Sequence, residues 1–223
     1  MAASCRAAGR DVAGVTLLVA SKYATDDQLL ELARAGQRVF GENRVQDAFE
    51  RMEMAEAAGF DLEWHFIGHL QTNKARQVVG RFALIHSIDS RHVAEAVSRR
   101  AVYDEATVDV LLQVNVDEDP AKQGFRPEEI LTGYPEVVAM AGITVRGLMT
   151  IGRLAEAPDA ARPTFAHLRT LRQDLDALGV APPLRDLSMG MSHDYQVAIE
   201  EGATIVRVGS AIFAGVPGEG SDR

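Results

Sequence analysis

The stretch VTLLVASKYATDDQ, residues 15–28, contains a complete strand-to-helix unit. The apolar run that opens it predicts a buried strand. Thr25, with Gln28 three residues later, forms a capping-box pattern, which predicts that a helix begins there. Lys22 stands between the two elements. A buried strand that ends on a lysine places one amine at the edge of a sheet, and this position needs an explanation.

The same unit repeats along the chain, because seven further apolar runs alternate with amphipathic segments. The predicted strands cover residues 15–20, 38–41, 63–67, 83–88, 107–116, 143–148, 184–187 and 204–208. Strict alternation implies parallel strands, since crossover helices join them. Eight such units in 223 residues predict a single (β/α)8 barrel domain over residues 1–223. An open doubly wound sheet is the alternative, but no G-x-G-x-x-G follows the first strand, where a dinucleotide-binding fold carries one.

Signals for helix ends mark several of the segments between the strands. Gly36 is a predicted stop for the first helix of the repeat. Ser90 and Ser192 are predicted N-caps, because a serine hydroxyl accepts hydrogen bonds from free backbone N–H groups at a helix start. A long apolar stripe at helical spacing ends at Gly179, and its members are Phe165, Leu168, Leu171, Leu175 and Leu178.

Composition limits the class of protein. The net charge of −9 argues against a general binder of nucleic acid or anionic membranes, since both require a basic face. Cys5 is the only cysteine, which excludes an internal disulfide. The first ten residues lack the apolar core of a secretory signal, and no apolar stretch approaches the roughly 18 residues of a membrane span. We therefore expect a soluble, cytoplasmic protein.

Lysine is rare in this chain. The 23 basic residues comprise 20 arginines and three lysines, Lys22, Lys74 and Lys122. Codon bias is the simplest explanation of the ratio. A chain that uses arginine for its surface charge nevertheless has less need of an ordinary lysine, so each of the three merits attention.

Polar side chains follow most of the predicted strands. In a (β/α)8 barrel the carboxyl ends of the strands form the functional face. The polar residues found there are Lys22, Glu42, Asn43, His69, Gln71, Asn73, Ser87 and Asn115. His65 and His69 are four residues apart, but they straddle a strand end rather than share a helix face, so we expect no metal site.

The loops after the last two strands resemble an anion site in composition. The segment SMGMS contains Ser188 and Ser192, and the segment GSAIF contains Gly209 and Ser210. Barrels often hold a phosphate with the loops after strands seven and eight and the start of a short helix, whose free N–H groups point at the anion. Two ordinary turns with capping serines are the alternative.

Lys22 and this predicted phosphate site would share one barrel mouth. Desolvation there would lower the pKa of Lys22 and free its amine as a nucleophile, which can form a Schiff base with a carbonyl compound. The alternative is a lysine whose stem is buried and whose head reaches water. The ligand class that fits both features is a phosphorylated aldehyde, either pyridoxal 5′-phosphate (PLP) or the sugar phosphate of a Schiff-base aldolase.

Arg207 helps to choose between these ligands. It lies two residues before Gly209, so the two positions face the same side of the last strand. An inward arginine needs an acceptor, and the pyridine nitrogen of PLP would serve. An arginine paired with a carboxylate such as Glu42 is the alternative.

Several segments together resemble the pyridoxal phosphate homeostasis protein family, the single-domain relatives of the alanine racemase barrel. They occur in order between residues 15 and 215, and they read LLVASK, VFGENRVQD, WHFIGHLQTNK, IHSID, LQVNVDEDPAKQGF, VRGLMTI and LSMGMSHDYQVAIEEGATIVRVGSAIFAG. The combination is far more specific than any one motif.

The resemblance implies that PLP is the cofactor and that Lys22 holds it as an internal aldimine. It implies cofactor-binding roles for eight residues. Ser192, Gly209 and Ser210 would hold the phosphate, Arg207 would face the pyridine nitrogen, and the cofactor would be lined by Asn43, Ser188 and Met189. The family is regarded as a carrier or regulator of PLP that affects vitamin B6 and amino-acid pools, without an established catalytic turnover. We accordingly expect a monomer whose partners are PLP and PLP-dependent apo-enzymes.

The sequence departs from the family pattern in two places. Many relatives carry a second lysine and a proline just after the Schiff-base lysine, where this chain has Ala24 and Thr25. Relatives also carry about one further helix before the first strand, so we expect that helix to be short or absent here. Two alternative functions stay open, a racemase-like PLP enzyme with Tyr195 as a second base and a Schiff-base aldolase with Glu42 as the acid–base residue.

Overall fold

Eight parallel strands close into a barrel in the computed structural model, which describes residues 1–152 and 157–213. The first strand pairs with the last over four positions, from Thr16↔Ile205 to Val19↔Val208. The strands are β1 Thr16–Ala20, β2 Val39–Glu42, β3 Glu63–Phe66, β4 Leu84–Ile88, β5 Val108–Gln113, β6 Ile143–Met149, β7 Asp186–Ser188 and β8 Ile205–Val208. The predicted (β/α)8 barrel is therefore confirmed, and the open sheet is excluded.

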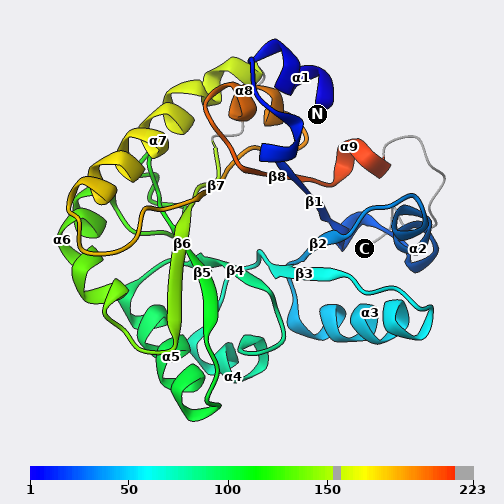
Figure 1. Ribbon diagram of the computed structural model, residues 1–223, viewed down its shortest axis with the longest axis horizontal. Helices are drawn as coiled ribbons and strands as arrows, with labels where there is room; N and C mark the ends of the chain where they lie inside the picture. Colours follow the sequence, from blue (N-terminus) through cyan, green and yellow to red (C-terminus); the bar gives the residue numbers. More distant parts are fainter. Residues whose placement is uncertain (153–156, 214–223) are drawn as a thin grey trace.

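A helix follows each strand, and the helices surround the barrel (Figure 1). They are α2 Asp26–Arg34, α3 Val45–Ala57, α4 Ala75–Val78, α5 Arg91–Tyr103, α6 Pro127–Val138, α7 Arg162–Ala177, α8 Tyr195–Glu200 and α9 Ser210–Phe213. Short 3₁₀ turns occupy η1 Val12–Gly14, η2 Ser21–Tyr23, η3 Thr72–Lys74 and η4 Pro158–Ala161. None of the helices in the described part of the chain has the length and apolar character needed to cross a lipid bilayer.

One short helix, α1 Ala2–Ala7, precedes β1, as the sequence predicted. It lies beside α8 (Figure 1). Arg10, just after it, donates from Nη1 to the carbonyl oxygens of Ile199 at 2.8 Å and Ala203 at 2.7 Å. These bonds satisfy carbonyls at the end of α8 and attach the N-terminal segment to the outside of the barrel.

Most of the predicted helix signals act as expected. The Thr25 hydroxyl accepts from the Gln28 N–H, and the Gln28 side chain accepts from the Thr25 N–H, which completes the capping box. Ser90 caps α5 through the N–H of Val93. Gly36 follows α2 with φ +100°, a conformation that favours glycine. The apolar stripe of α7 is buried, except that Leu178 lies beyond the helix end and is exposed.

Six strands lie within one residue of their predicted bounds, and two differ by more. β5 ends at Gln113, three residues earlier than predicted, because the chain then pairs with its own loop: Phe125 donates to the carbonyl of Gln113, and Asn115 donates to that of Phe125. β7 is shifted toward its carboxyl end, since its pairing with β6 begins at Asp186↔Gly147 and extends to Ser188.

The interior of the barrel is partly apolar and partly polar. An apolar cluster fills one part, and it consists of Leu18, Leu84, Leu111, Met149 and Ile205. Four buried polar side chains occupy the rest, namely His65, His86, Ser188 and Arg207. The larger hydrophobic core lies between the outside of the barrel and the ring of helices.

Candidate cofactor site

A cavity of about 370 Å³ opens at the carboxyl ends of β1, β2 and β8. Six of the eight predicted cofactor residues line it, and they are Lys22, Asn43, Ser192, Arg207, Gly209 and Ser210. The structure therefore brings the amine, the arginine and both predicted phosphate loops to one cavity.

Lys22 lies in the 3₁₀ turn that leaves β1. The neighbouring Ser21 points inward, and its hydroxyl donates to the Gly41 carbonyl at 3.0 Å and to Glu42 Oε1 at 2.6 Å. Lys22 itself is exposed, with its Nζ 4.6 Å from the centre of the Tyr23 ring. Of the two interpretations of Lys22, the structure agrees with the one in which its head reaches water, and the predicted desolvation is wrong.

Glu42 is buried, and the partners of its carboxylate differ from Arg207, the partner that the sequence suggested. Its Oε1 accepts from Arg51 Nη1 at 2.5 Å as well as from Ser21. Arg51 also donates to the carbonyls of Ser21 and Ala24. The alternative that pairs Glu42 with Arg207 is thus wrong. The carboxylate stabilises the turn that carries Lys22.

Arg207 is buried and faces the cavity from β8. Its Nη1 donates to the hydroxyl of Ser188 at 2.7 Å, and its Nη2 donates to the carbonyl of Thr150 at 2.8 Å. Burial lowers the pKa of Arg207 to about 10, and the nearby Asp194 carboxylate opposes this shift. The guanidinium is therefore positively charged at neutral pH.

Ser192 connects the two predicted phosphate loops. Its hydroxyl accepts from the N–H groups of Gly209 and Ala211, both at 3.1 Å. The prediction that Ser192 caps its own helix is wrong, because α8 begins only at Tyr195. The expected free N–H groups after β8 are also not all free, since the serine oxygen already binds two of them.

Gly209 sits where the turn after β1 meets the loop after β8. A Cβ at this position would lie 2.9 Å from Tyr23 Cδ2 and 3.0 Å from the Ala20 carbonyl oxygen. Glycine is therefore required for close approach of the two segments. Ser210 follows it and is exposed at the cavity wall.

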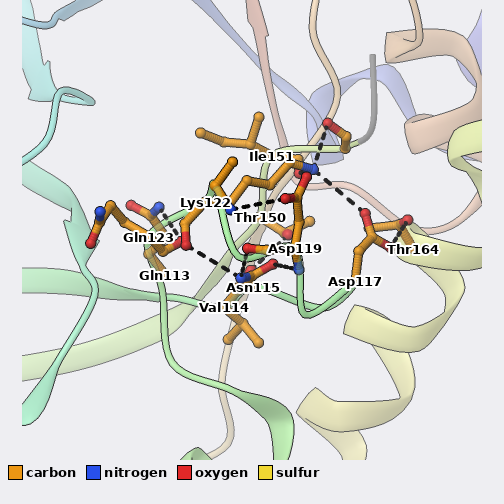
Figure 2. Close-up of polar contacts among 12 residues, drawn as sticks. Gln113, Val114, Asn115, Asp117, Asp119, Lys122, Gln123, Thr150, Ile151 and Thr164 are labelled. Carbon is orange, nitrogen blue, oxygen red and sulfur yellow. Dashed lines mark hydrogen bonds and ion pairs between the residues drawn. The ribbon is translucent and has the colours of Figure 1, made fainter. Parts of the chain in front are cut away.

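The part of the wall that follows β6 depends on the loop after β5, whose polar contacts are drawn in Figure 2. Lys122 Nζ donates to the carbonyls of Ile151 at 3.2 Å and Gly152 at 3.3 Å, and it lies 3.5 Å from Asp117 Oδ2. The Asn115 side chain donates to the carbonyls of Asp119 and Lys122. Since Ile151 lines the cavity, the hydrogen bonds of Lys122 stabilise this part of the wall.

The remaining predicted residues lie outside the cavity wall. Ser188 and Met189 are completely buried beneath it. His65 points into the barrel, whereas His69 pairs through Nδ1 with Asp89 Oδ2 at 3.1 Å. Among residues 1–152 and 157–213 no group of three potential ligands for a metal ion is found.

Sequence reasoning missed several residues of the wall, namely Tyr23, Ile67, Ile151, Met191, His193 and Asp194. The last three belong to the same segment as Ser192, so their place in that loop was a usable signal. Asp194 is buried, and its Oδ1 accepts from the Met191 N–H at 2.6 Å. This bond shapes the loop and leaves a carboxylate near Arg207.

Replacement of Gly68 by alanine is expected to lower the unfolding free energy by about 1–3 kcal/mol, because an added Cβ overpacks a rigid contact. That Cβ would lie 2.0 Å from the carbonyl oxygen of Asn43, a residue of the cavity wall. Urea denaturation measures the change. The matched control is Gly133→Ala in α6, where a Cβ meets open space and stability should be equal or higher. Equal stabilities of Gly68→Ala and the unmodified protein would contradict the argument.

The chain is similar to known proteins over nearly its whole length. The family model described as alanine racemase, N-terminal domain, matches residues 9–217. The pyridoxal phosphate homeostasis protein of Aquifex aeolicus is 43% identical over 94% of this chain and 91% of the relative. That of Pseudomonas aeruginosa is 40% identical over 94% of this chain and 88% of the relative.

Solved structures agree with this similarity. PipY from Synechococcus elongatus, in a structure described as having PLP bound, matches with a TM-score of 0.83 at 37% identity, over 96% of this chain and 98% of PipY. An alanine racemase from Clostridium difficile matches with a TM-score of 0.75 at 13% identity, over 98% of this chain and 56% of the racemase. The second likeness shows the barrel fold alone.

Proposed function

The chain belongs to the pyridoxal phosphate homeostasis protein family, and from this premise we propose that it binds PLP at the cavity described above and acts in intracellular PLP homeostasis, as a carrier or regulator of vitamin B6 and amino-acid pools. One observation carries the proposal: an amine, a buried arginine and two hydroxyl-bearing loops line the same cavity. The relatives' names and the PLP described in PipY support it.

The cavity suits a ligand of this size and chemistry. Its volume of about 370 Å³ lies within the range of roughly 300–1,000 Å³ that is usual for small-ligand sites. Ser192, Gly209 and Ser210 provide small residues and hydroxyls for a phosphate, while Arg207 provides N–H donors for a ring nitrogen. A guanidinium with a pKa of about 10 does not give up its proton at neutral pH, so the ring nitrogen would stay unprotonated.

In the proposed complex, Lys22 holds the cofactor covalently. PLP supplies an aldehyde carbon that captures amines reversibly. Lys22 Nζ would hold the cofactor through that carbon, with the aldehyde oxygen released as water. The exposure of Lys22 gives the aldehyde access to the amine.

The two enzymatic alternatives have weaker support. Tyr195, the proposed second base of a racemase, does not belong to the cavity wall. Glu42, the proposed acid–base residue of an aldolase, is buried and bound by Ser21 and Arg51. Neither side chain is therefore placed to exchange protons with a ligand in this cavity.

Delivery of PLP to PLP-dependent apo-enzymes stays a prediction, as do the monomeric state and the cytoplasmic location. Transfer through a second lysine beside Lys22 is not available to this chain. Ala24 is buried in that place, and Thr25 caps α2.

The absorption spectrum of the protein with PLP tests the proposal. We expect a visible band from the Schiff base, which borohydride abolishes by reducing the C=N bond to a stable amine. The chain has only three lysines, so peptide mapping of the reduced protein assigns the adduct to one of them without ambiguity. A protein that binds no PLP, covalently or otherwise, would overturn the proposed function.

A further inference from the structure

A line of polar side chains runs through the barrel interior from Arg207 to Glu63. Arg207 Nη1 lies 2.7 Å from the Ser188 hydroxyl, which lies 2.9 Å from His86 Nδ1. His86 Nε2 lies 2.9 Å from His65 Nδ1, and His65 Nε2 lies 2.7 Å from Glu63 Oε1. We call these five residues the relay.

The relay connects the two ends of the barrel. Arg207 faces the candidate cofactor site from β8, whereas Glu63 is the first residue of β3 and has a side chain that is 53% exposed. The three residues between them are buried. Since β4 and β7 are not neighbours in the sheet, the contact between His86 and Ser188 crosses the barrel interior.

The arginine end fixes the direction of the hydrogen bonds. A guanidinium can only donate, so the Ser188 oxygen accepts from Arg207. The one hydrogen of Ser188 is then donated to His86 Nδ1, the other polar atom within reach. A neutral His86 carries its proton on Nε2 and donates it to His65 Nδ1. A neutral His65 therefore carries its proton on Nε2 and donates it to Glu63.

The glutamate end agrees with this direction for the bond that it makes. An ionised carboxylate can only accept, so His65 must donate to Glu63. The hydrogen bond from His65 keeps the pKa of Glu63 below its usual value. Burial holds the pKa of His86 well below its usual value, so this imidazole is neutral. Every donor and acceptor in the relay is then satisfied in one arrangement only.

We infer that the relay is a positioning device for the cofactor: Glu63, His65 and His86 orient the Ser188 hydroxyl so that its lone pairs face Arg207 and fix the guanidinium beneath the ring nitrogen. This inference rests on the proposed function. The Ser188 hydroxyl accepts a hydrogen bond from Arg207 Nη1, and the Thr150 carbonyl accepts one from Nη2. Each of these nitrogens keeps a second hydrogen, and Arg207 lines the cavity.

The protonation state of the free protein provides the first test. Nitrogen-15 NMR of the imidazole rings is expected to show His65 and His86 neutral, each with its proton on Nε2. This measurement needs no PLP, so it stands even if the proposed function fails. A proton on Nδ1 of either ring, or a charged ring at neutral pH, would overturn the relay.

A matched pair of serine variants provides the second test. Ser188→Ala is expected to weaken PLP binding about tenfold and to shift the absorption band, because Arg207 loses an oriented acceptor. Ser87→Ala is the control. Ser87 lies beside His86 on β4 and is equally buried, and its hydroxyl has no hydrogen-bond partner among the described residues. Equal PLP affinity and spectra in the two variants would overturn the inference.

Variants at the far end separate orientation from general stability. Glu63→Gln keeps an acceptor for His65, so the histidine tautomers and the PLP affinity should be unchanged. Glu63→Leu removes the acceptor, and we expect a tautomer change in His65 and PLP binding weakened about threefold, since the bond to Arg207 is affected only indirectly. Identical tautomers and affinities in both variants would show that the exposed end takes no part.

Discussion

Lys22→Ala is expected to abolish the borohydride-stable PLP adduct completely. Alanine has no amine, and Lys22 is the only lysine in the wall of the cavity. Some reversible PLP binding should persist, because Arg207, Ser192 and Ser210 are unchanged. Mass spectrometry of the reduced protein measures the adduct, and dialysis with absorption spectroscopy measures the reversible part. Lys22→Arg should also lose the adduct, since a guanidinium keeps the charge but does not form the Schiff base.

Lys74→Ala is the matched control for this prediction. Lys74 ends the turn η3 and lies outside the cavity wall, so its removal should leave the adduct intact. Lys122 is the alternative position for the adduct. Its Nζ donates hydrogen bonds to the carbonyls of Ile151 and Gly152. A full-strength adduct on Lys122 in the Lys22→Ala protein would show that the assignment of the lysine is wrong.

Arg207→Leu is expected to lower the unfolding free energy by at least about 2 kcal/mol, because each buried acceptor left without its donor costs about 1–3 kcal/mol. The Ser188 hydroxyl and the Thr150 carbonyl would lose their donor, and the buried Asp194 would lose a nearby positive charge. Urea denaturation measures the change as a lower midpoint with an unchanged slope. PLP binding should fall in parallel.

Two further variants sharpen the Arg207 prediction. Arg99→Leu removes an exposed arginine that lies 3.9 Å from Glu95, and it should change stability by less than about 0.5 kcal/mol. Combining Arg207→Leu with Asp194→Asn should restore part of the loss, because the uncompensated charge is also removed. An Arg207→Leu protein as stable as the Arg99→Leu protein would contradict the argument.

Most of the fold could be predicted from local sequence patterns. Alternating apolar runs and caps such as Thr25 and Ser90 depend on residues within a few positions of each other, so they predicted the eight strands and several helix ends. Two bounds were wrong for a non-local reason. The end of β5 depends on Phe125, twelve residues beyond Gln113, and the start of β7 depends on its register with β6.

Some members of the candidate site could be predicted from the sequence, but their contacts could not. Strand periodicity places Arg207 and Gly209 on the same side of the last strand, and Lys22 directly follows the first strand. The exposure of Lys22 depends on a 3₁₀ turn that no sequence pattern marks, and the partner of Glu42 proved to be an arginine of α3.

The contacts within the relay show most clearly what a sequence pattern does not predict. Strand periodicity places His65 and His86 inside the barrel, but His86 meets Ser188 from 102 residues away. Such a contact depends on how eight strands are staggered around a closed barrel. The stagger is a property of the whole sheet rather than of any segment.

The hydroxyl of Ser192 joins the loops after β7 and β8 through the N–H groups of Gly209 and Ala211. These loops are thus already held in one conformation by the chain itself, and a ligand does not have to order them. Association loses affinity when flexible segments become immobile. A pre-formed binding surface avoids that entropic penalty, so few direct contacts are enough to hold the cofactor.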